Sequence, residues 1–164
     1  MGLDTPATDW QVFGRVSVAG GAGIAAGLYI FDFYSATAGV SAQFGFHGYG
    51  FGEGGNLGGL SPPEDVGPIT AWSSLDCDRP FSIYDMDGAW GRISYLGGAV
   101  GVGYSAIFIT ASPRFWTLQS FFHSQYVGGI SVLSVGGGGQ VLLGGWNFKR
   151  VSNNLPDADS AAVA

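Results

Sequence analysis

The chain has 164 residues, of which 30 are glycine and only 11% are charged, and its formal net charge is -6. A chain of this length usually forms one domain, and an aromatic content of 15% excludes the glycine-rich disordered class, which lacks aromatic side chains. Six Lys and Arg residues are too few to neutralise a row of phosphates, so we expect no nucleic-acid partner.

The two ends of the chain are polar. Residues 1–10 contain neither a basic segment nor an apolar one, so they do not resemble a secretory signal peptide. We therefore expect a cytoplasmic protein, or one exported by a route without an N-terminal signal peptide. Residues 1–150 are expected to form a single β domain with a long acidic loop at 52–80, and residues 151–164 to form a flexible C-terminal tail.

Glycine alternates with aromatic residues in the first half of the chain, as in the run from Gly48 to Gly52. Successive side chains of a strand point to opposite faces, so this pattern predicts strands with one bulky face and one bare face. Phe44 and Phe46 share one parity whereas Tyr49 and Phe51 share the other. We therefore predict a change of face near His47 and Gly48, of the kind that a β-bulge produces.

The acidic residues are concentrated between 52 and 87, where two short motifs resemble halves of a calcium loop. Neither motif continues into a full loop with a terminal glutamate, so calcium is only a weak candidate, and no other cofactor is predicted. Acidic side chains at turns also remain solvated and keep a protein of low charge soluble. The candidate metal ligands are Asp76, Asp78, Asp85 and Asp87.

A β-hairpin is predicted over residues 81–95. Residues 81–86 and 89–95 both alternate, and they flank Asp87 and Gly88, a pair typical of a two-residue hairpin turn with positive φ. Beyond it the parity of the large residues changes at Gly97 and Gly98, which predicts a second bulge or tight corner.

The fold that these patterns favour is all-β. We predict a glycine-kinked antiparallel β-barrel or tight β-sandwich of about eight strands, since bulges and glycine kinks let a sheet bend enough to close. Residues 113–127 leave two interpretations open. Ser112 and Pro113 are typical of a helix start, but the large residues that follow also fit the alternation of a strand.

The aromatic residues are more numerous than a core of this size usually holds, which predicts that some of them lie on a contact surface. We expect a non-catalytic protein that acts through apolar and aromatic contacts, either by self-association as a homo-oligomer or by binding a hydrophobic ligand or protein partner. Two alternatives stay open: a leaderless membrane-inserting or pore-forming bacterial effector, and a small enzyme that uses acidic residues of 52–87. The candidate contact residues are Phe44, Phe46, His47, Tyr49, Phe51, Trp72 and Trp90.

Overall fold

The computed structural model describes residues 2–20, 22–53, 72–98, 100–114, 119–135 and 138–156. The described chain is nearly all sheet, with one short helix, which confirms the all-β prediction. In chain order the elements are β1 (Trp10–Gly20), β2 (Ala22–Ser35), β3 (Val40–Glu53), β4 (Ser73–Ser74), α1 (Ile83–Met86), β5 (Trp90–Gly98), β6 (Val100–Ser112), β7 (Phe122–Val135) and β8 (Gly138–Val151).

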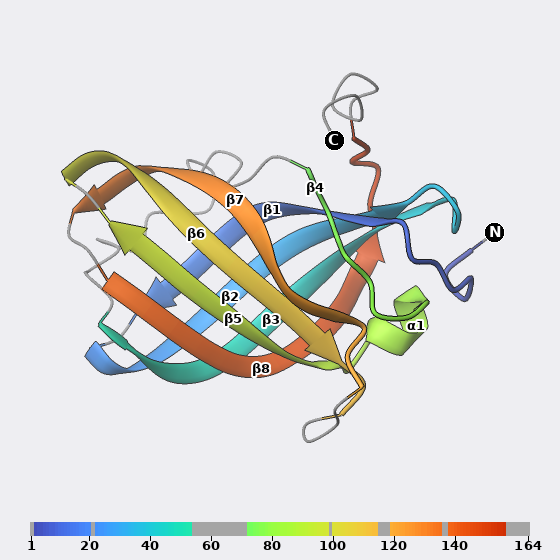
Figure 1. Cartoon of the computed structure of the whole chain (residues 1–164), viewed down its shortest axis with the longest axis horizontal. Helices are drawn as coiled ribbons and strands as arrows, with labels where there is room; N and C mark the ends of the chain where they lie inside the picture. Colours follow the sequence, from blue (N-terminus) through green and yellow to red (C-terminus); the bar gives the residue numbers. More distant parts are fainter. Residues whose placement is uncertain are drawn as a thin grey trace.

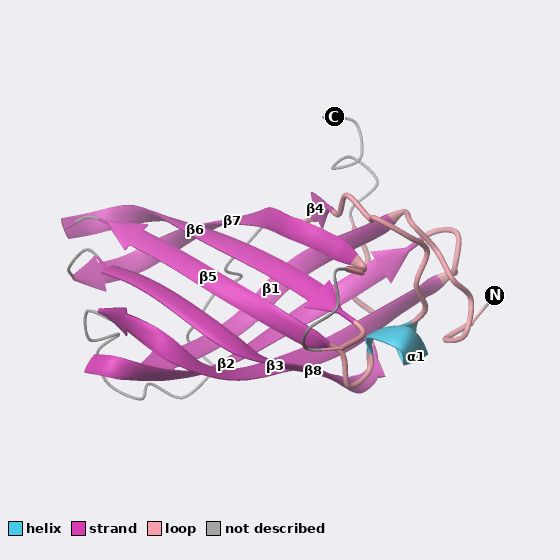
Figure 2. Ribbon diagram, turned by 60° about the horizontal axis from the view of Figure 1, so that its bottom comes forward, coloured by secondary structure: helices cyan, strands magenta, loops and turns pink. Residues whose placement is uncertain are grey.

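The eight strands form one antiparallel sheet in the order β4-β1-β2-β3-β8-β5-β6-β7. The sheet curls into a half-barrel (Figures 1 and 2). Its two outer strands approach each other at one end, where Cys77, just after β4, bridges to Phe122 of β7. The Asp78 N–H also donates to the Phe121 carbonyl at 2.9 Å. Backbone bonds therefore join the two edges of the sheet at this end.

The two ends of the half-barrel differ. At one end, which we call the hairpin end, β1, β3, β5 and β7 finish and β2, β6 and β8 begin; it lies at the left of Figure 1. The opposite end, which we call the helix end, carries α1 and the N-terminal segment. That segment is tied to the residues before α1 by a bridge between Ala7 and Phe81.

The aromatic core fills the interior toward the helix end. The Trp146 ring lies 5.1 Å from the Phe46 ring, 5.5 Å from Phe31 and 5.7 Å from Phe33, measured between centroids. Its indole N–H donates to the Thr110 carbonyl at 2.9 Å, so the buried ring leaves no polar atom unpaired. The largest side chains that are fully buried are Trp10, Phe31, Phe33, Phe44, Phe46, Phe81, Phe122 and Trp146.

The predicted hairpin over residues 81–95 is wrong in its first half. Residues 83–86 form α1, because Ser82 accepts a hydrogen bond from the Asp85 N–H while the Asp85 carboxylate accepts one from the Ser82 N–H. This reciprocal capping box starts a helix and not a strand. Gly88 has the predicted positive φ, at 79°, but it follows the helix and does not close a hairpin.

The predicted change of face near His47 is also wrong. The whole of β3 pairs with β2 without a register shift, so its side chains alternate throughout. Phe44 and Phe46 point into the core, and Tyr49 and Phe51 point outward. At Gly97 and Gly98 the parity changes because β5 ends at Gly98 and β6 begins at Val100. The register shifts of the sheet lie elsewhere, one of them between Gly14 and Val16.

Residues 113–127 were compatible with a helix or a strand, and the structure decides between the two for the residues that it describes. β6 extends to Ser112, and residues 122–127 belong to β7, so this segment contributes strand. Residues 115–118 lie outside the described residues, as do 54–71 of the predicted acidic loop and 157–164 of the predicted tail.

Candidate apolar contact surface

An exposed apolar surface lies on the outer face of three neighbouring strands at the hairpin end. Residues on the inner face of β2, β3 and β8 are buried, so the residues between them face outward. The strands pair in register, and their outward residues therefore form rows across the sheet. Starting from the hairpin end, the rows are Ile24 with Phe51 and Val141, then Ala26 with Tyr49 and Leu143, then Leu28 with His47 and Gly145, then Ile30 with Gly45 and Asn147.

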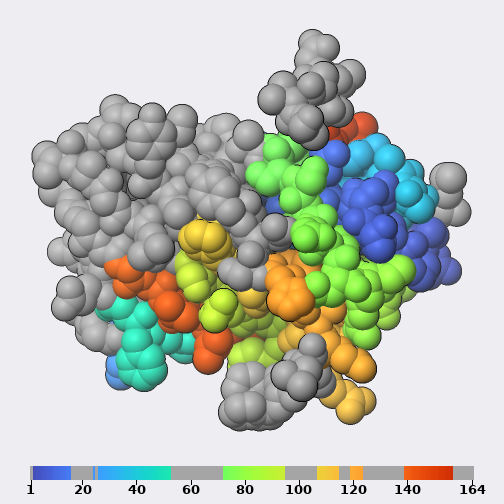
Figure 3. All heavy atoms as spheres, in the orientation of Figure 1, coloured from blue at the N-terminus to red at the C-terminus, as the bar shows by residue number. Residues whose placement is uncertain are grey.

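The large side chains of the first two rows are open to solvent. Phe51 is 77% exposed, Ile24 75% and Tyr49 72%. Val141, Leu143 and Leu28 are also exposed. The described atoms of β3 (teal) and β8 (orange-red) lie side by side at the lower left of Figure 3. We define the apolar surface as Ile24, Leu28, Tyr49, Phe51, Val141 and Leu143.

The inner face of β3 opposite this surface carries glycine. A Cβ atom added to Gly48 would lie 2.7 Å from the Phe46 ring, and one added to Gly50 would lie 1.8 Å from the Val141 carbonyl oxygen. The backbones of β3 and β8 therefore approach each other more closely than side chains would allow. Along β3 the bulky residues face inward near the helix end and outward near the hairpin end.

Polar and basic side chains border the apolar surface. The His47 Nδ1 lies 2.9 Å from the Asn147 amide nitrogen, in the rows farther from the hairpin end. The Lys149 side chain covers Gly45, where an added Cβ would lie 2.5 Å from its Cε. On the other flank, Arg92 of β5 is exposed and pairs with Leu143.

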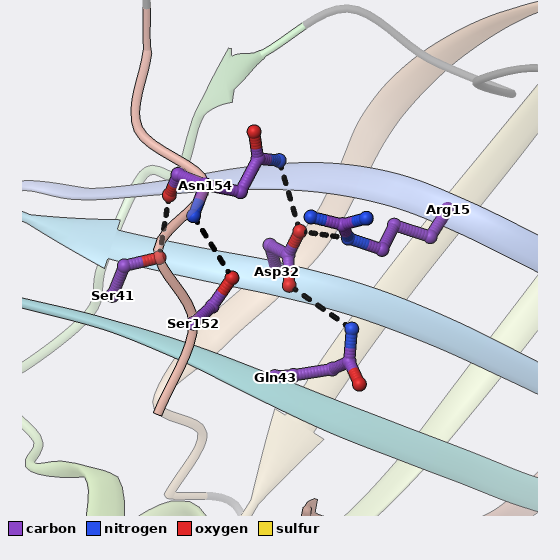
Figure 4. A network of polar contacts seen from close by, with 6 residues as sticks. All are labelled: Arg15, Asp32, Ser41, Gln43, Ser152 and Asn154. Atoms are coloured by element: carbon purple, nitrogen blue, oxygen red, sulfur yellow. Dashed lines mark hydrogen bonds and ion pairs between the residues drawn. The ribbon is translucent and has the colours of Figure 1, made fainter. Parts of the chain in front are cut away.

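A buried carboxylate lies farther along the outer face of β2. Asp32 is fully buried and accepts hydrogen bonds from the Arg15 guanidinium, from the Gln43 amide at 3.4 Å and from the Asn154 amide at 2.9 Å (Figure 4). Asn154 belongs to the segment that follows β8, and its carbonyl accepts a bond from the Ser41 hydroxyl. This segment therefore covers the outer face of β2 and β3 beside the apolar surface.

The four predicted metal ligands do not form one group. Asp85 caps α1, and Asp87 accepts a hydrogen bond from the Phe148 N–H at 2.8 Å. Asp78 contacts Ser120 and His123, on the segment that leads into β7 and on β7 itself. Asp76 lies between β4 and the bridging residue Cys77. Among the described residues, no group of three or more His, Cys, Asp and Glu side chains is placed to hold a metal ion.

Three of the seven predicted contact residues belong to or border the apolar surface, namely Tyr49, Phe51 and His47. Phe44 and Phe46 are fully buried in the core. Trp72 packs beside Phe13 and Tyr34, away from the surface, and Trp90 is half-buried at the start of β5. Sequence reasoning missed the four aliphatic members Ile24, Leu28, Val141 and Leu143. The available signal was the run of three apolar residues at 141–143, because a strand places alternate members of such a run on opposite faces. In the structure Leu142 is buried, and Val141 and Leu143 are exposed.

Two titratable groups toward the helix end have shifted pKa values. Partial burial, reinforced by the nearby carboxylates of Asp76 and Asp78, raises the pKa of the Cys77 thiol to about 11. Burial alone would raise the pKa of Asp9, but hydrogen bonds from the Ser35 hydroxyl and the Thr37 N–H outweigh it and lower that pKa.

In the part of the chain that the structure describes, no helix has the length and apolar character needed to cross a bilayer. Comparisons of the chain with protein-family models, with curated proteins and with solved structures found no match.

Proposed function

We propose that the protein is a non-catalytic β protein that acts through its exposed apolar surface. The observation that carries the proposal is the contiguity of six large apolar side chains on three paired strands. Single exposed apolar residues are common on proteins, but contiguous patches usually mark sites of contact with another molecule.

The outward position of these residues also supports the proposal. Tyr49 and Phe51 face solvent on a strand whose inner positions are glycine, so they contribute little to the core on either side. A fold that needed only to be stable would gain from placing this aromatic bulk inside, since burying such a side chain is worth about 1.5–3 kcal/mol.

The acidic residues support an enzyme less well. Asp78, Asp85 and Asp87 each contact different partners, whereas paired-carboxylate chemistry needs two carboxyl groups facing one cleft.

The test is to make the surface polar without touching the core. The double variant Tyr49→Ser with Phe51→Ser should lose most of its binding to the fluorescent apolar probe bis-ANS and any concentration-dependent self-association seen by light scattering. A matched control is Tyr84→Ser, because Tyr84 is 61% exposed but lies on α1 at the helix end. Near-UV circular dichroism checks that each variant keeps its fold. A wild-type protein that neither binds the probe nor self-associates would refute the proposal.

A further inference from the structure

We propose that the occupant of the apolar surface is the same surface of a second copy of the chain. The two copies form a closed dimer in which the facing strands are antiparallel and a twofold axis crosses β3 at Tyr49. This inference rests on the proposed function, because it names the partner that the apolar surface contacts.

The exposed area of the apolar surface is large enough for a stable dimer. Three of its six residues are 72–77% exposed and the other three are 45% exposed. A whole large side chain offers about 150–250 Å², so the six residues together expose roughly 500–900 Å². Each partner in a specific protein complex usually contributes about 600–1,000 Å². Homodimer interfaces are also the more apolar class, which suits a surface of six uncharged side chains.

The shape of the face favours another sheet over a small ligand. The apolar surface lies on the outer, convex side of the curled sheet (Figures 1 and 2), whereas small-molecule sites are concave and enclose most of the ligand. Two curled sheets touch over the greatest area when their strands are aligned. Sheets that pack face to face keep their strand directions within about 30° of each other. The occupant that fits this face is therefore a second sheet with aligned strands.

The outward residues are bulky on one side of the Tyr49 row and smaller on the other. The row nearer the hairpin end contains Phe51 and Val141, and the row nearer the helix end contains His47 and Gly145. A Cβ added to Gly145 would meet nothing closer than 3.8 Å, so this outward position is bare. With antiparallel strands, the bulky row of each copy lies over the smaller row of the other. Val141 then fills the space over Gly145, and every contact occurs twice, as a twofold interface requires.

The placement of charge selects the same antiparallel arrangement. The Lys149 ammonium covers the residue of β3 that lies four positions before Tyr49. Glu53 lies four positions after Tyr49 and has the same parity. Antiparallel packing about Tyr49 therefore brings Glu53 of each copy level with Lys149 of the other, whereas parallel packing would bring like charges together. Asp32 and Arg15 form an ion pair with each other, so they add no unpaired charge beside the surface.

The first experiment measures the dimer dissociation constant by sedimentation equilibrium over a range of protein concentrations. We expect a reversible monomer–dimer equilibrium. Phe51→Asp and Val141→Asp should each raise the dissociation constant about tenfold or more, because each places a charge inside an apolar interface. Tyr84→Asp, on α1, should leave it unchanged, since Tyr84 is exposed but lies at the helix end. Near-UV circular dichroism reports the folding of each variant.

The second experiment locates the twofold axis without altering the apolar surface. Cys77 is the one cysteine of the chain, so Cys77→Ser with Ala26→Cys, or with Asn147→Cys, leaves a single thiol. Ala26 belongs to the Tyr49 row, and Asn147 lies two rows farther from the hairpin end. Facing sheets are about 10 Å apart, so a short bis-maleimide should link two copies through position 26. Two Asn147→Cys thiols should not be linked, because they lie about 26 Å apart along the strands.

The third experiment exchanges the two charges. Glu53→Lys and Lys149→Glu should each raise the dissociation constant about 3–10-fold, because each brings two like charges together at the edge of the interface. The combined variant with both substitutions restores opposite charges in the antiparallel dimer, so its dissociation constant should return to that of the wild type. In a parallel dimer the combined variant would stay as weak as the single variants.

The outcomes separate the two proposals. A wild-type protein that binds bis-ANS through the apolar surface but stays monomeric at every concentration would overturn the dimer inference alone, and a ligand or a different protein would then be the occupant. Equal effects of Phe51→Asp and Tyr84→Asp would also overturn it, as would assembly beyond the dimer. Linkage through position 147, or failure of the combined charge variant to recover, would overturn the antiparallel arrangement. A wild-type protein that remains monomeric and does not bind bis-ANS would refute both proposals.

Discussion

Two adjacent glycines in β8 give a direct test of how closely the strands pack. A Cβ atom added to Gly144 would lie 1.9 Å from the His47 carbonyl oxygen and 2.6 Å from the Gly48 Cα, both of which are backbone atoms of β3. A Cβ added to Gly145 would meet nothing closer than 3.8 Å. Both positions lie between the same two strands, β3 and β5, so each substitution is the control for the other.

Gly144→Ala requires β3 and β8 to separate by about 1.5 Å to restore an ordinary contact of 3.4 Å. Overpacking of this kind usually costs about 1–3 kcal/mol of the free energy of unfolding. Gly145→Ala should be neutral or should stabilise by up to about 1 kcal/mol, because alanine loses less conformational entropy than glycine when a strand forms. The expected difference is therefore about 1–4 kcal/mol, which corresponds to a difference in Tm of roughly 3–15 °C in a chain of this size.

The assay is urea denaturation followed by tryptophan fluorescence, with the slope of the transition checked for equality between the variants. Equal stability of the two variants, or a larger loss in Gly145→Ala, would show that the strands do not pack as closely as described. In that case the glycines of β3 and β8 would not explain why the aromatic side chains there face outward.

Four shorter predictions concern single groups. Because folding lowers the pKa of Asp9, this carboxylate stabilises the fold above its ordinary pKa of 3.8, and the contribution is lost as the pH falls through the lower pKa of the folded state. Asp9→Asn should therefore flatten the dependence of the free energy of unfolding on pH below about pH 4. An unchanged dependence would contradict this. Alkylation of Cys77 by iodoacetamide at pH 8 should be about 100-fold slower than that of a thiol with the ordinary pKa of 9.0, since its pKa is about 11; a rate near that of a free thiol would refute the raised pKa. Asp32→Ala should destabilise the fold by about 1–3 kcal/mol in urea denaturation, because three donors lose their charged acceptor. It should also make the segment after β8 more sensitive to proteases. Unchanged resistance to proteases would show that this segment is held independently of Asp32. Millimolar calcium should leave the melting curve unchanged, because Asp78, Asp85 and Asp87 are already engaged in separate contacts; a rise in Tm that EDTA reverses would support calcium binding.

The sequence predicts the strands well because alternation is a local property. The runs of glycine and aromatic residues in β3, and the alternation from Trp90 onward in β5, follow directly from the period of two. The helix α1 was missed although Ser82 and Asp85 have the spacing of a capping box, because the Asp87-Gly88 pair that follows is also the strongest short hairpin signal. Both signals are local, and only packing of Phe81, Ile83 and Met86 into the core decides between them.

The candidate surface was predicted in part. The sequence shows that Tyr49 and Phe51 have the opposite parity to Phe44 and Phe46, but the predicted change of face near His47 is wrong, because β3 pairs with β2 without a register shift. Alternation says which residues share a face and not which face is buried. The hydrogen-bond network of Asp32 could not be predicted from the sequence, for another reason. Asn154 is 122 positions from Asp32, and no local pattern connects a residue of β2 with the segment that follows β8.

The division between the two ends explains how an exposed apolar surface and a stable fold can coexist in one sheet. The rings around Trp146, the buried Asp32 network and the bridge from Cys77 to Phe122 do not include any member of the apolar surface. Surface substitutions away from such features usually change stability by less than about 0.5 kcal/mol. Tyr49, Phe51 and Val141 can therefore be replaced without unfolding the protein, and a loss of binding in these variants reports on the surface itself. By the same reasoning, we expect that these side chains are not needed for folding, which is consistent with the contact function proposed above.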